Sequence, residues 1–359
     1  MSLHFHPLKI KKIKKETPDC VSVSLEVPKA LAAVFEYKEG QSITFKTFIN
    51  DEEIRRSYSI CTAPFESELK VAIKKVDGGL FSTFANDVLR ENDMIDVMAP
   101  SGKFNARLTN KNNSNYLAIA AGSGITPIIA IIKHTLHTQP DSNMTLLYGS
   151  KNRPGIIFFE ELENLKNKYI SRFNFINILS QEKTEADINF GRIDANKLSA
   201  LEPLIDYKKM DAVYCCGPEE MIFTASDFLQ KSGIDKKDIH FELFTVPGQT
   251  KKTQKNNSDE SASKGPMSHV TIKVDGRSFS FELAHKDQNI LDAALKHGAD
   301  LPYACKGGVC CTCKAKLMSG NVSMDVNYAL EEDEISQGFI LTCQSHPTTE
   351  KVIIDFDAR

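Results

Sequence analysis

Residues 305–313 read Cys-Lys-Gly-Gly-Val-Cys-Cys-Thr-Cys, and a further cysteine, Cys343, follows later in the chain. The spacing C-x4-C-x2-C with a distant fourth cysteine is typical of the ligands of a plant-type [2Fe–2S] cluster. Gly307 and Gly308 lie inside the loop, where a backbone that wraps closely around a cluster needs residues without a Cβ. The sequence therefore predicts a metal site with four thiolate ligands, Cys305, Cys310, Cys313 and Cys343.

Other interpretations of these cysteines fit less well. A zinc site prefers two separated C-x2-C pairs, and a disulfide framework belongs to small secreted domains. Cys311 falls outside the ligand spacing, so it is not predicted to bind iron. Residues 1–10 lack the apolar core of a signal peptide, which predicts a cytoplasmic location where thiols stay free to hold iron.

The composition bears on size and partners. The chain has 359 residues and a formal net charge of −3, which predicts a soluble protein of two or three domains and does not favour nucleic acid as a partner. No apolar run approaches the ~20 residues of a membrane span, so no membrane partner is predicted.

A polar segment separates the cysteine-rich end from the rest. Residues 247–266, PGQTKKTQKNNSDESASKGP, are predicted to be a flexible linker, with an ordered surface loop as the alternative. After them, His269–Val274 and Ser278–Leu283 alternate like a hairpin, and Ile290–His297 is predicted to be a short amphipathic helix. Together with Leu341-Thr-Cys-Gln around the fourth cysteine, these segments resemble the β-grasp ferredoxin domain.

Before the linker, the clearest unit is residues 115–138, where an apolar strand leads into Gly122-Ser-Gly-Ile-Thr-Pro127 and an apolar helix. Thr126 is predicted to be the helix N-cap, with Pro127 in the first turn. Such a turn presents backbone N–H groups to a dinucleotide pyrophosphate. The full fingerprint has a third glycine in place of Pro127, so an ordinary Rossmann dehydrogenase is disfavoured. Later strand ends of the same kind predict an α/β domain: Leu146–Ser150, Asn177–Ser180 and Val213–Pro218.

The end of the second strand of the predicted α/β domain, at Ser150, bears on the choice of nucleotide. An acidic residue there would hold the ribose 2′-OH of NADH, whereas cationic or hydroxyl groups accept the 2′-phosphate of NADPH. Ser150, Lys151 and Arg153 occupy this place, which favours NADPH and leaves NADH as the alternative. The competing interpretation is that these are solvated loop residues.

The first hundred residues contain short alternating strands, which predict an antiparallel barrel. One strand carries Arg56-Ser-Tyr58-Ser59, a set able to hold a phosphate, stack on a flat ring and hydrogen-bond its edge, although the tetrapeptide alone is a weak signal. Gly78-Gly-Leu-Phe-Ser-Thr83 opens a helix and offers a second anion-binding N-terminus. The predicted strands are Cys20–Val27, Ser42–Phe48, Arg55–Cys61, Leu69–Val76 and Met94–Ala99.

The order R-x-Y-S, G-G-x-x-S, A-G-S-G-I-T-P and C-G-P across residues 1–245 resembles the ferredoxin–NADP reductase superfamily. With its ferredoxin-like end, the whole chain resembles the reductases of multicomponent oxygenases. The resemblance implies an FAD-binding antiparallel β-barrel domain (1–108), an α/β NAD(P)-binding domain (109–246) and, after the linker, an α+β β-grasp ferredoxin domain (267–359). Four segments resemble most the reductase subunits of bacterial phenylacetyl-CoA epoxidases: LDAALK at 291–296, LPYACKGGVC at 301–310, MDVNYAL at 324–330 and LTCQSHP at 341–347.

The resemblance also implies roles for single residues around the flavin. Arg56 would hold the flavin pyrophosphate, and Tyr58 would stack on the isoalloxazine. Ser59 would hydrogen-bond near the reactive N5. Gly79 and Ser82 would receive the FAD phosphates.

On the nucleotide side, the resemblance assigns the NADPH pyrophosphate to Gly122, Gly124 and Thr126. Cys216, followed by Gly217 in the C-G-P turn, would lie beside the nicotinamide carbon that gives up hydride, unless it is simply a buried strand-end cysteine. Glu242 and Phe244 match the end of the nucleotide domain, where the aromatic ring covers the flavin, although such a pair is often simple packing. Ser59, Cys216 and Glu242 are therefore the predicted catalytic residues.

These roles imply an electron-transfer enzyme. Electrons would pass from NADPH to FAD, then to the [2Fe–2S] cluster, and then to a partner di-iron oxygenase. The chain lacks the two E-x-x-H motifs that a di-iron site uses, so the oxygen chemistry would belong to that partner. The alternatives are a reductase for another oxygenase or hydroxylase and, from a different class, a non-catalytic redox sensor.

Overall fold

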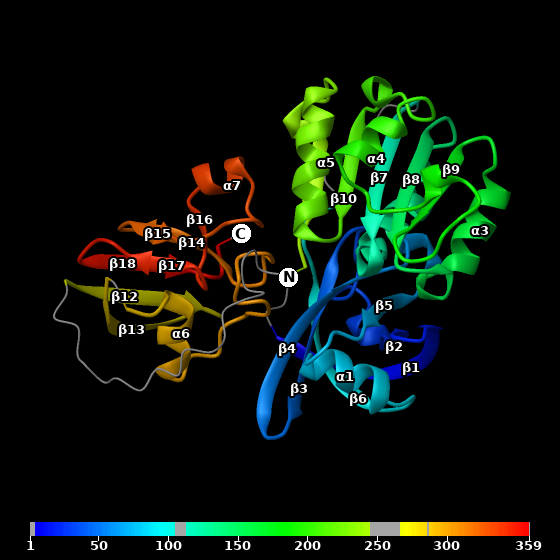
Figure 1. Cartoon of the computed structure of the whole chain (residues 1–359). Helices are drawn as coiled ribbons and strands as arrows, with labels where there is room; N and C mark the ends of the chain where they lie inside the picture. Colours follow the sequence, from blue (N-terminus) through cyan, green and yellow to red (C-terminus); the bar gives the residue numbers. More distant parts are fainter. Residues whose placement is uncertain (1–3, 105–112, 245–265, 286, 359) are drawn as a thin grey trace. The chain divides into compact units, whose positions relative to one another are not determined.

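The computed structural model describes residues 4–104, 113–244, 266–285 and 287–358. They fall into two compact units, Met1–Phe244 and Thr245–Arg359 (Figure 1). The predicted linker at 247–266 lies, except for Pro266, outside the described residues, and so does the predicted boundary between residues 108 and 109.

The first unit begins with a six-stranded antiparallel sheet in the order β4-β3-β6-β1-β2-β5. A bridge between Ile60, just after β4, and Val71 in β5 joins the two outer strands, so the sheet closes into the predicted barrel. The helix α1 (Leu80–Asp87) packs on β2, β3 and β5. The strands are β1 (Phe5–Thr17), β2 (Cys20–Glu26), β3 (Ser42–Ile49), β4 (Glu52–Ser59), β5 (Leu69–Lys74) and β6 (Met94–Ser101).

The strand β1 was not predicted from the sequence. It reads FHPLKIKKIKKET, in which exposed lysines surround the buried Leu8 and Ile10. Lysine disfavours strands, but pairing with β2 on one side and β6 on the other places β1 inside the sheet. Tertiary pairing therefore overrides the weak local propensity.

A five-stranded parallel sheet completes the first unit, in the order β11-β10-β7-β8-β9. The chain runs from β7 outward to β9 and then places β10 and β11 on the other side, so the order reverses between β7 and β10. In such sheets, ligands bind at the carboxyl ends of the strands beside the reversal. The elements are β7 (Asn115–Ala121), α2 (Ile125–Thr138), β8 (Asn143–Ser150), α3 (Phe159–Lys168), β9 (Phe173–Leu179), α4 (Ala195–Ala200), β10 (Ala212–Cys216), α5 (Glu219–Lys231) and β11 (Ile239–Glu242).

The barrel and the parallel sheet share a core. Cys20 and Cys61 from the barrel are buried in the same apolar cluster as Ile128 and Ile132 of α2. These two cysteines are therefore packing residues. The shared core holds the two domains of the first unit against each other.

The second unit contains a five-stranded mixed sheet, β13-β12-β18-β14-β16, and a ribbon of β15 and β17. Asp275 and Gly276 both have positive φ, as a two-residue hairpin turn requires, which confirms the predicted hairpin. Asn289 caps α6 by accepting a hydrogen bond from the Asp292 N–H. The elements are β12 (Met267–Val274), β13 (Arg277–Ala284), α6 (Ile290–Lys296), β14 (Lys314–Ser319), β15 (Val322–Met324), α7 (Glu332–Ser336), β16 (Phe339–Leu341), β17 (Ser345–Pro347) and β18 (Lys351–Asp355).

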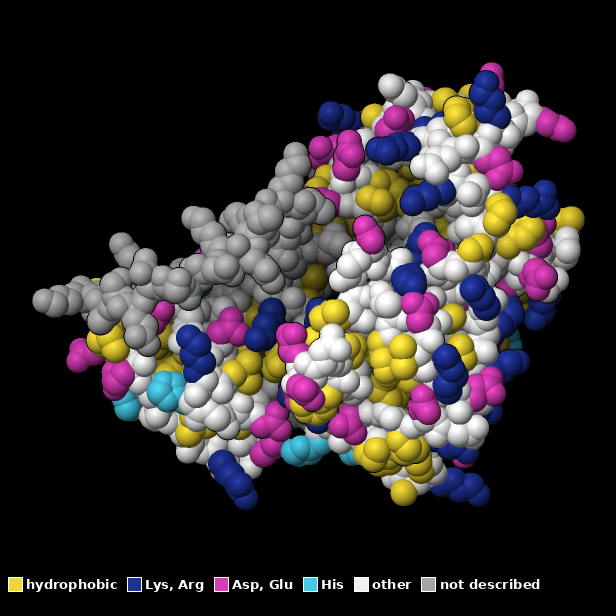
Figure 2. Space-filling view, turned by 60° about the horizontal axis from the view of Figure 1, so that its bottom comes forward, with side chains coloured by type: hydrophobic (Ala, Val, Ile, Leu, Met, Phe, Trp, Pro, Cys, Tyr) yellow, Lys and Arg dark blue, Asp and Glu magenta, His cyan; other side chains and the backbone are white. Residues whose placement is uncertain are grey.

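The surface carries both signs of charge. Figure 2 shows Lys and Arg side chains interspersed with Asp and Glu over the face in view, and neither sign gathers into one area of the described atoms there. Among the helices in the described ranges, none is long and apolar enough to cross a membrane.

Candidate functional site

The four predicted ligand thiols come together in the second unit. Cys310 Sγ lies 3.1 Å from Cys305 Sγ, and hydrogen bonds from Cys310 and Cys343 hold the pKa of Cys305 far below its usual value. Cys343 also donates a hydrogen bond to Cys313, which lowers the pKa of the Cys313 thiol. Within the described residues, no three His, Cys, Asp or Glu side chains converge as a single-ion site requires. Because Cys343 contacts both Cys305 and Cys313, the four thiols form one linked group, which fits the four thiolate ligands of a two-iron cluster.

Backbone packing shapes the cysteine loop. Gly308 has φ +73°, and a Cβ there would lie 3.0 Å from the Val326 side chain and carbonyl oxygen, so the predicted need for glycine holds at this position. The Cys311 thiol donates to the Ala329 carbonyl oxygen at 3.1 Å. Cys311 is therefore bonded to the backbone of another segment, which agrees with its place outside the ligand spacing.

The glycine turn lies at the carboxyl end of β7, beside the reversal of strand order. A 3-10 turn, η3 (Gly122–Gly124), leads directly into α2, whose N-cap is Gly124. The prediction of Thr126 as the N-cap is wrong, because the turn already has helical dihedral angles and the helix begins earlier. Thr126 lies in the first turn, where its hydroxyl donates to the Ser123 carbonyl oxygen at 3.0 Å.

Two strand ends meet at this turn. A Cβ on Gly124 would lie 2.0 Å from the Cys216 carbonyl oxygen and 2.9 Å from the Gly217 nitrogen, so the turn and the C-G-P loop are in direct backbone contact. Gly122 has φ +55°, and a Cβ there would meet only Lys74 Nζ, at 4.0 Å. The space in front of Gly122 is therefore open and could hold a pyrophosphate against the helix N-terminus.

The three predicted catalytic residues come from different strands of the first unit and lie together. Ser59 Oγ donates to Glu242 Oε2 at 3.0 Å, which joins the end of β4 to β11. Cys216 pairs with Glu242 across β10 and β11. Burial raises the pKa of Glu242 to about 7 and that of Cys216 well above its usual value, so the thiol is neutral. Phe244, also predicted here, is exposed.

The predicted flavin-binding side chains lie along β4. The half-buried Tyr58 ring packs on Phe81, with centroids 5.5 Å apart, and burial raises the pKa of its hydroxyl. Arg56 is exposed two residues before it. A rigidly packed ring beside an exposed cation could hold a flat heterocycle and its phosphate.

The second glycine loop has a different construction from the first. Gly79 is the N-cap of α1. The buried Ser82 hydroxyl accepts a hydrogen bond from the Val76 N–H at 3.1 Å and donates to the Gly79 carbonyl oxygen at 3.2 Å. Ser82 therefore holds the loop in shape through its own hydroxyl.

The residues predicted to select the nucleotide lie at the carboxyl end of β8. Ser150 is buried, and its Oγ makes no hydrogen bond of ordinary geometry with the described residues. Arg153 begins the short turn η4 (Arg153–Gly155), and its guanidinium lies 5.1 Å from the Phe159 ring centroid. Its backbone N–H donates to Glu182 Oε2 at 2.8 Å.

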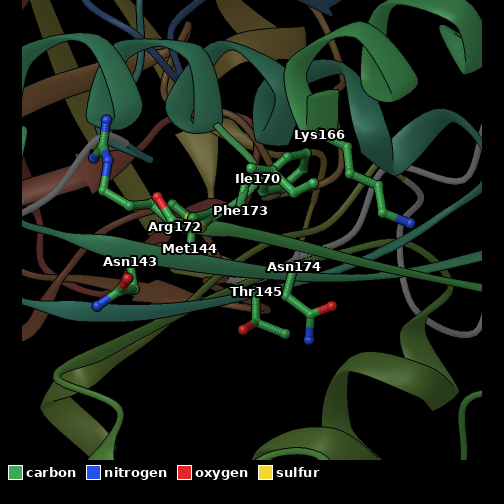
Figure 3. Close-up of a pocket in the computed structure, with 9 residues that line it drawn as sticks. Asn143, Met144, Thr145, Lys166, Ile170, Arg172, Phe173 and Asn174 are labelled. Atoms are coloured by element: carbon green, nitrogen blue, oxygen red, sulfur yellow. The ribbon is translucent and has the colours of Figure 1, made fainter. Parts of the chain in front are cut away.

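A hollow of about 320 Å³ lies at the opposite, amino ends of β8 and β9 (Figure 3). Lys166 and Arg172 stand at its two sides. The Arg172 guanidinium is already bonded to three backbone carbonyl groups, so it offers little to a ligand. Because the predicted nucleotide site lies at the carboxyl ends of the strands, this hollow is separate from it.

Two residues near the predicted sites were missed from the sequence. Lys74 Nζ reaches the glycine turn from β5 of the barrel, while also lying 3.5 Å from Asp19 Oδ2. Gln344 Nε2 donates to the Lys306 carbonyl oxygen at 3.1 Å and lies 3.7 Å from Cys343 Sγ. In the sequence, the only local indication of a role for Gln344 is its position directly after the predicted ligand Cys343. Nothing in the sequence near Lys74 points to a glycine turn in another domain.

Three domain families match the chain in order: Oxidoreductase FAD-binding domain at residues 7–106, Oxidoreductase NAD-binding domain at 118–227 and 2Fe-2S iron-sulfur cluster binding domain at 272–348. Together with the fold and the sites, they define a flavin- and nicotinamide-dependent oxidoreductase with an iron–sulfur domain. The chain is 42% identical to a subunit of 1,2-phenylacetyl-CoA epoxidase from Escherichia coli (strain K12), over 99% of this chain and 98% of that protein. It belongs to the family of that epoxidase component.

Other proteins are similar over nearly all of this chain. The ferredoxin reductase component of 3-ketosteroid-9-alpha-monooxygenase from Rhodococcus rhodochrous is 29% identical, over 97% of this chain and 96% of that protein. Among solved structures, phthalate dioxygenase reductase is 23% identical with a TM-score of 0.58, over 98% of both chains. An intact type IV self-sufficient cytochrome P450 monooxygenase is 20% identical with a TM-score of 0.70, over 98% of this chain and 41% of that one. The predicted fold class and family are confirmed.

Proposed function

We propose that this chain is the NADPH-dependent reductase of a cytoplasmic multicomponent oxygenase, and that its partner is a di-iron phenylacetyl-CoA epoxidase. One observation carries the reductase role: a single chain combines glycine turns and strand ends suited to a nicotinamide and a flavin with thiols suited to a two-iron cluster. The full-length similarity to a component of such an epoxidase supports the choice of partner.

The barrel residues would bind and orient FAD. When bound, FAD supplies the conversion of an electron pair from a nicotinamide into single electrons for an iron–sulfur cluster. Arg56 would neutralise the pyrophosphate, and the packed Tyr58 ring would fix the orientation of the isoalloxazine. Gly79 and Ser82 would keep the second phosphate loop in shape.

The crevice at the strand reversal would bind the nucleotide. Gly122, Gly124 and Thr126 would place the first turn of α2 against the pyrophosphate, and Lys74 would add a positive charge from the barrel side. Cys216 with Gly217 would form the wall beside the nicotinamide, as a neutral thiol. Glu242, whose pKa burial raises to about 7, would hold or release a proton at its carboxyl group, and Ser59, which donates to Oε2, would connect that group to the ring edge.

The preference for NADPH over NADH rests on the end of β8. The Ser150 hydroxyl and the Arg153 guanidinium suit a 2′-phosphate, which needs donors and positive charge. Phe244 would cover the flavin.

Reconstitution tests the proposal. A purified di-iron epoxidase core is given phenylacetyl-CoA and oxygen, with this protein added or withheld, and with NADPH or NADH in parallel. Turnover that requires this chain and is faster with NADPH is the expected result. If NADPH bleaches the flavin and the cluster but phenylacetyl-CoA is not consumed, the chain is a reductase for a different oxygenase. If neither nucleotide bleaches the flavin, the reductase role fails and a redox sensor takes its place.

A further inference from the structure

Lys133 is a buried cation at the junction of the two domains of the first unit. It lies on α2, and its side chain is 5% exposed. Its Nζ is 2.7 Å from Glu66 Oε2, in the turn η2 (Pro64–Glu66) of the barrel domain, and 2.8 Å from Glu161 Oε1 on α3. One ammonium group therefore ties a barrel loop to two helices of the nucleotide-binding domain.

The same stretch of α2 makes two further contacts with the barrel domain. The rings of His137 and Phe65 stack with centroids 4.0 Å apart, and His134 Nδ1 lies 3.6 Å from Glu39 Oε2. Glu66 is itself fixed, because its Oε2 also accepts a hydrogen bond of 2.6 Å from the backbone N–H three residues earlier. The Lys133 ammonium thus meets a carboxylate whose position is already set.

This arrangement gives α2 a single preferred position. A buried charge is stable only while its partners remain in place, so any tilt that separates Lys133 from Glu66 or Glu161 leaves charges uncompensated. Lys133 lies eight residues after Ile125, which corresponds to about 12 Å along the helix axis. Because a helix of this length moves as a rigid rod, the ion triad also fixes the glycine turn at its N-terminus.

We propose that Lys133, acting through Glu66 and Glu161, is a positioning residue for hydride transfer. It holds the glycine turn, and the nucleotide bound there, in register with the barrel domain, so that one hydride with its two electrons passes from the reduced nicotinamide to the flavin. This inference rests on the proposed NADPH-to-FAD function. A misplacement of about 1 Å costs about 100-fold in rate. The triad lies away from the crevice, so it affects the rate at saturation more than nucleotide affinity.

Four variants of the full chain separate positioning from simple stabilisation. Lys133→Met removes the ammonium but keeps most of the side-chain length, and Lys133→Arg keeps the charge. The triple variant E66Q/K133M/E161Q removes all three charges and so leaves no carboxylate uncompensated. Lys209→Met is the matched control, because it removes an exposed ion pair of 3.0 Å with Asp206 in the same domain.

The measurement is anaerobic stopped-flow reduction of the flavin by saturating NADPH, on preparations with matched flavin and iron content. The deuterium isotope effect with C4-labelled NADPH and the thermal midpoint are recorded for each variant. We expect the limiting rate to fall about 10- to 100-fold in Lys133→Met and in the triple variant, with nucleotide affinity changing less than about threefold. Lys133→Arg should recover most of the rate, and the triple variant should recover thermal stability without recovering the rate. Lys209→Met should match the unchanged protein.

Two results would overturn the positioning role. One is a triple variant that regains the rate together with its stability, and the other is a Lys133→Met protein that loses stability but keeps the rate. In either case Lys133 is only a structural residue. If neither NADPH nor NADH reduces the flavin of the unchanged protein, the proposed function fails first and the positioning role falls with it.

Discussion

The cysteine loop of the second unit and the glycine turn of the first are built on opposite principles. In the loop, the proposed binding of a cluster would depend on side-chain atoms, because the thiols of Cys305 and Cys310 meet at 3.1 Å. In the turn, the proposed binding of a nucleotide would depend on missing side chains, because Gly124 touches the Cys216 backbone and Gly122 leaves open space. A site made of side chains should fail when the residue type changes. A site made of backbone should fail when any atom is added.

The largest effect is expected in the cysteine loop. Cys313→Ser should lose nearly all cluster iron and visible cluster absorbance, because a two-iron cluster needs four thiolates. Reduction of the flavin by NADPH should continue, since it uses the first unit alone. Cys311→Ser is the matched control and should keep its cluster, because the Cys311 thiol is bonded to the Ala329 carbonyl oxygen. Equal iron loss in both variants would contradict the assignment of ligands.

The next largest effect is expected in the glycine turn, where the variant adds an atom to a residue that has no side chain. Gly124→Ala adds one carbon that would lie 2.0 Å from the Cys216 carbonyl oxygen, so the turn and the C-G-P loop must separate. We expect flavin reduction by NADPH to slow by about 100-fold or more, while chemical reduction of the cluster by dithionite is unchanged.

A glycine elsewhere provides the control for that experiment. Gly233 has φ +98° and no atom within 4 Å of an added Cβ, so Gly233→Ala costs only backbone strain of about 1–2 kcal/mol. It should lower the thermal midpoint and leave the rate near normal. If Gly124→Ala behaves in the same way, the close contact has no part in nucleotide use.

The smallest effect tests whether side-chain chemistry matters in the backbone-built site. The pKa of Glu242 is raised to about 7, so its carboxyl is neutral below that pH and ionised above it. An ionised carboxylate opposes the negative charge that arrives with hydride, so flavin reduction should slow by roughly tenfold as the pH rises through 7. Glu242→Gln should remove this dependence and keep the low-pH rate throughout. A pH profile that is the same in both proteins would exclude Glu242 as its source.

The sequence was more informative about the cysteine loop than about the turn, for a physical reason. Three of the four thiols lie within nine residues, and their chemistry is fixed by residue type. The glycine turn was also found, but its helix start was misplaced at Thr126, because capping rules do not describe a 3-10 turn that continues into a helix. Lys74 and Lys133 were missed because their partners lie far away in the chain and only the folded domains bring them together.

The parallel pairing of β12 with β18 has a consequence for how the protein is made. Lys273 on β12 donates a hydrogen bond to Asp355 on β18, which lies 82 positions later in the chain. Strands that are so far apart in the sequence pair slowly, because the entropy of closing a long loop is lost before any stabilising contact forms. Cys305, Cys310 and Cys313 therefore leave the ribosome before the sheet beside them can exist. We therefore expect a cluster to bind only after the last strand has been made, and the thiols to remain accessible to oxidants and to other metals until then.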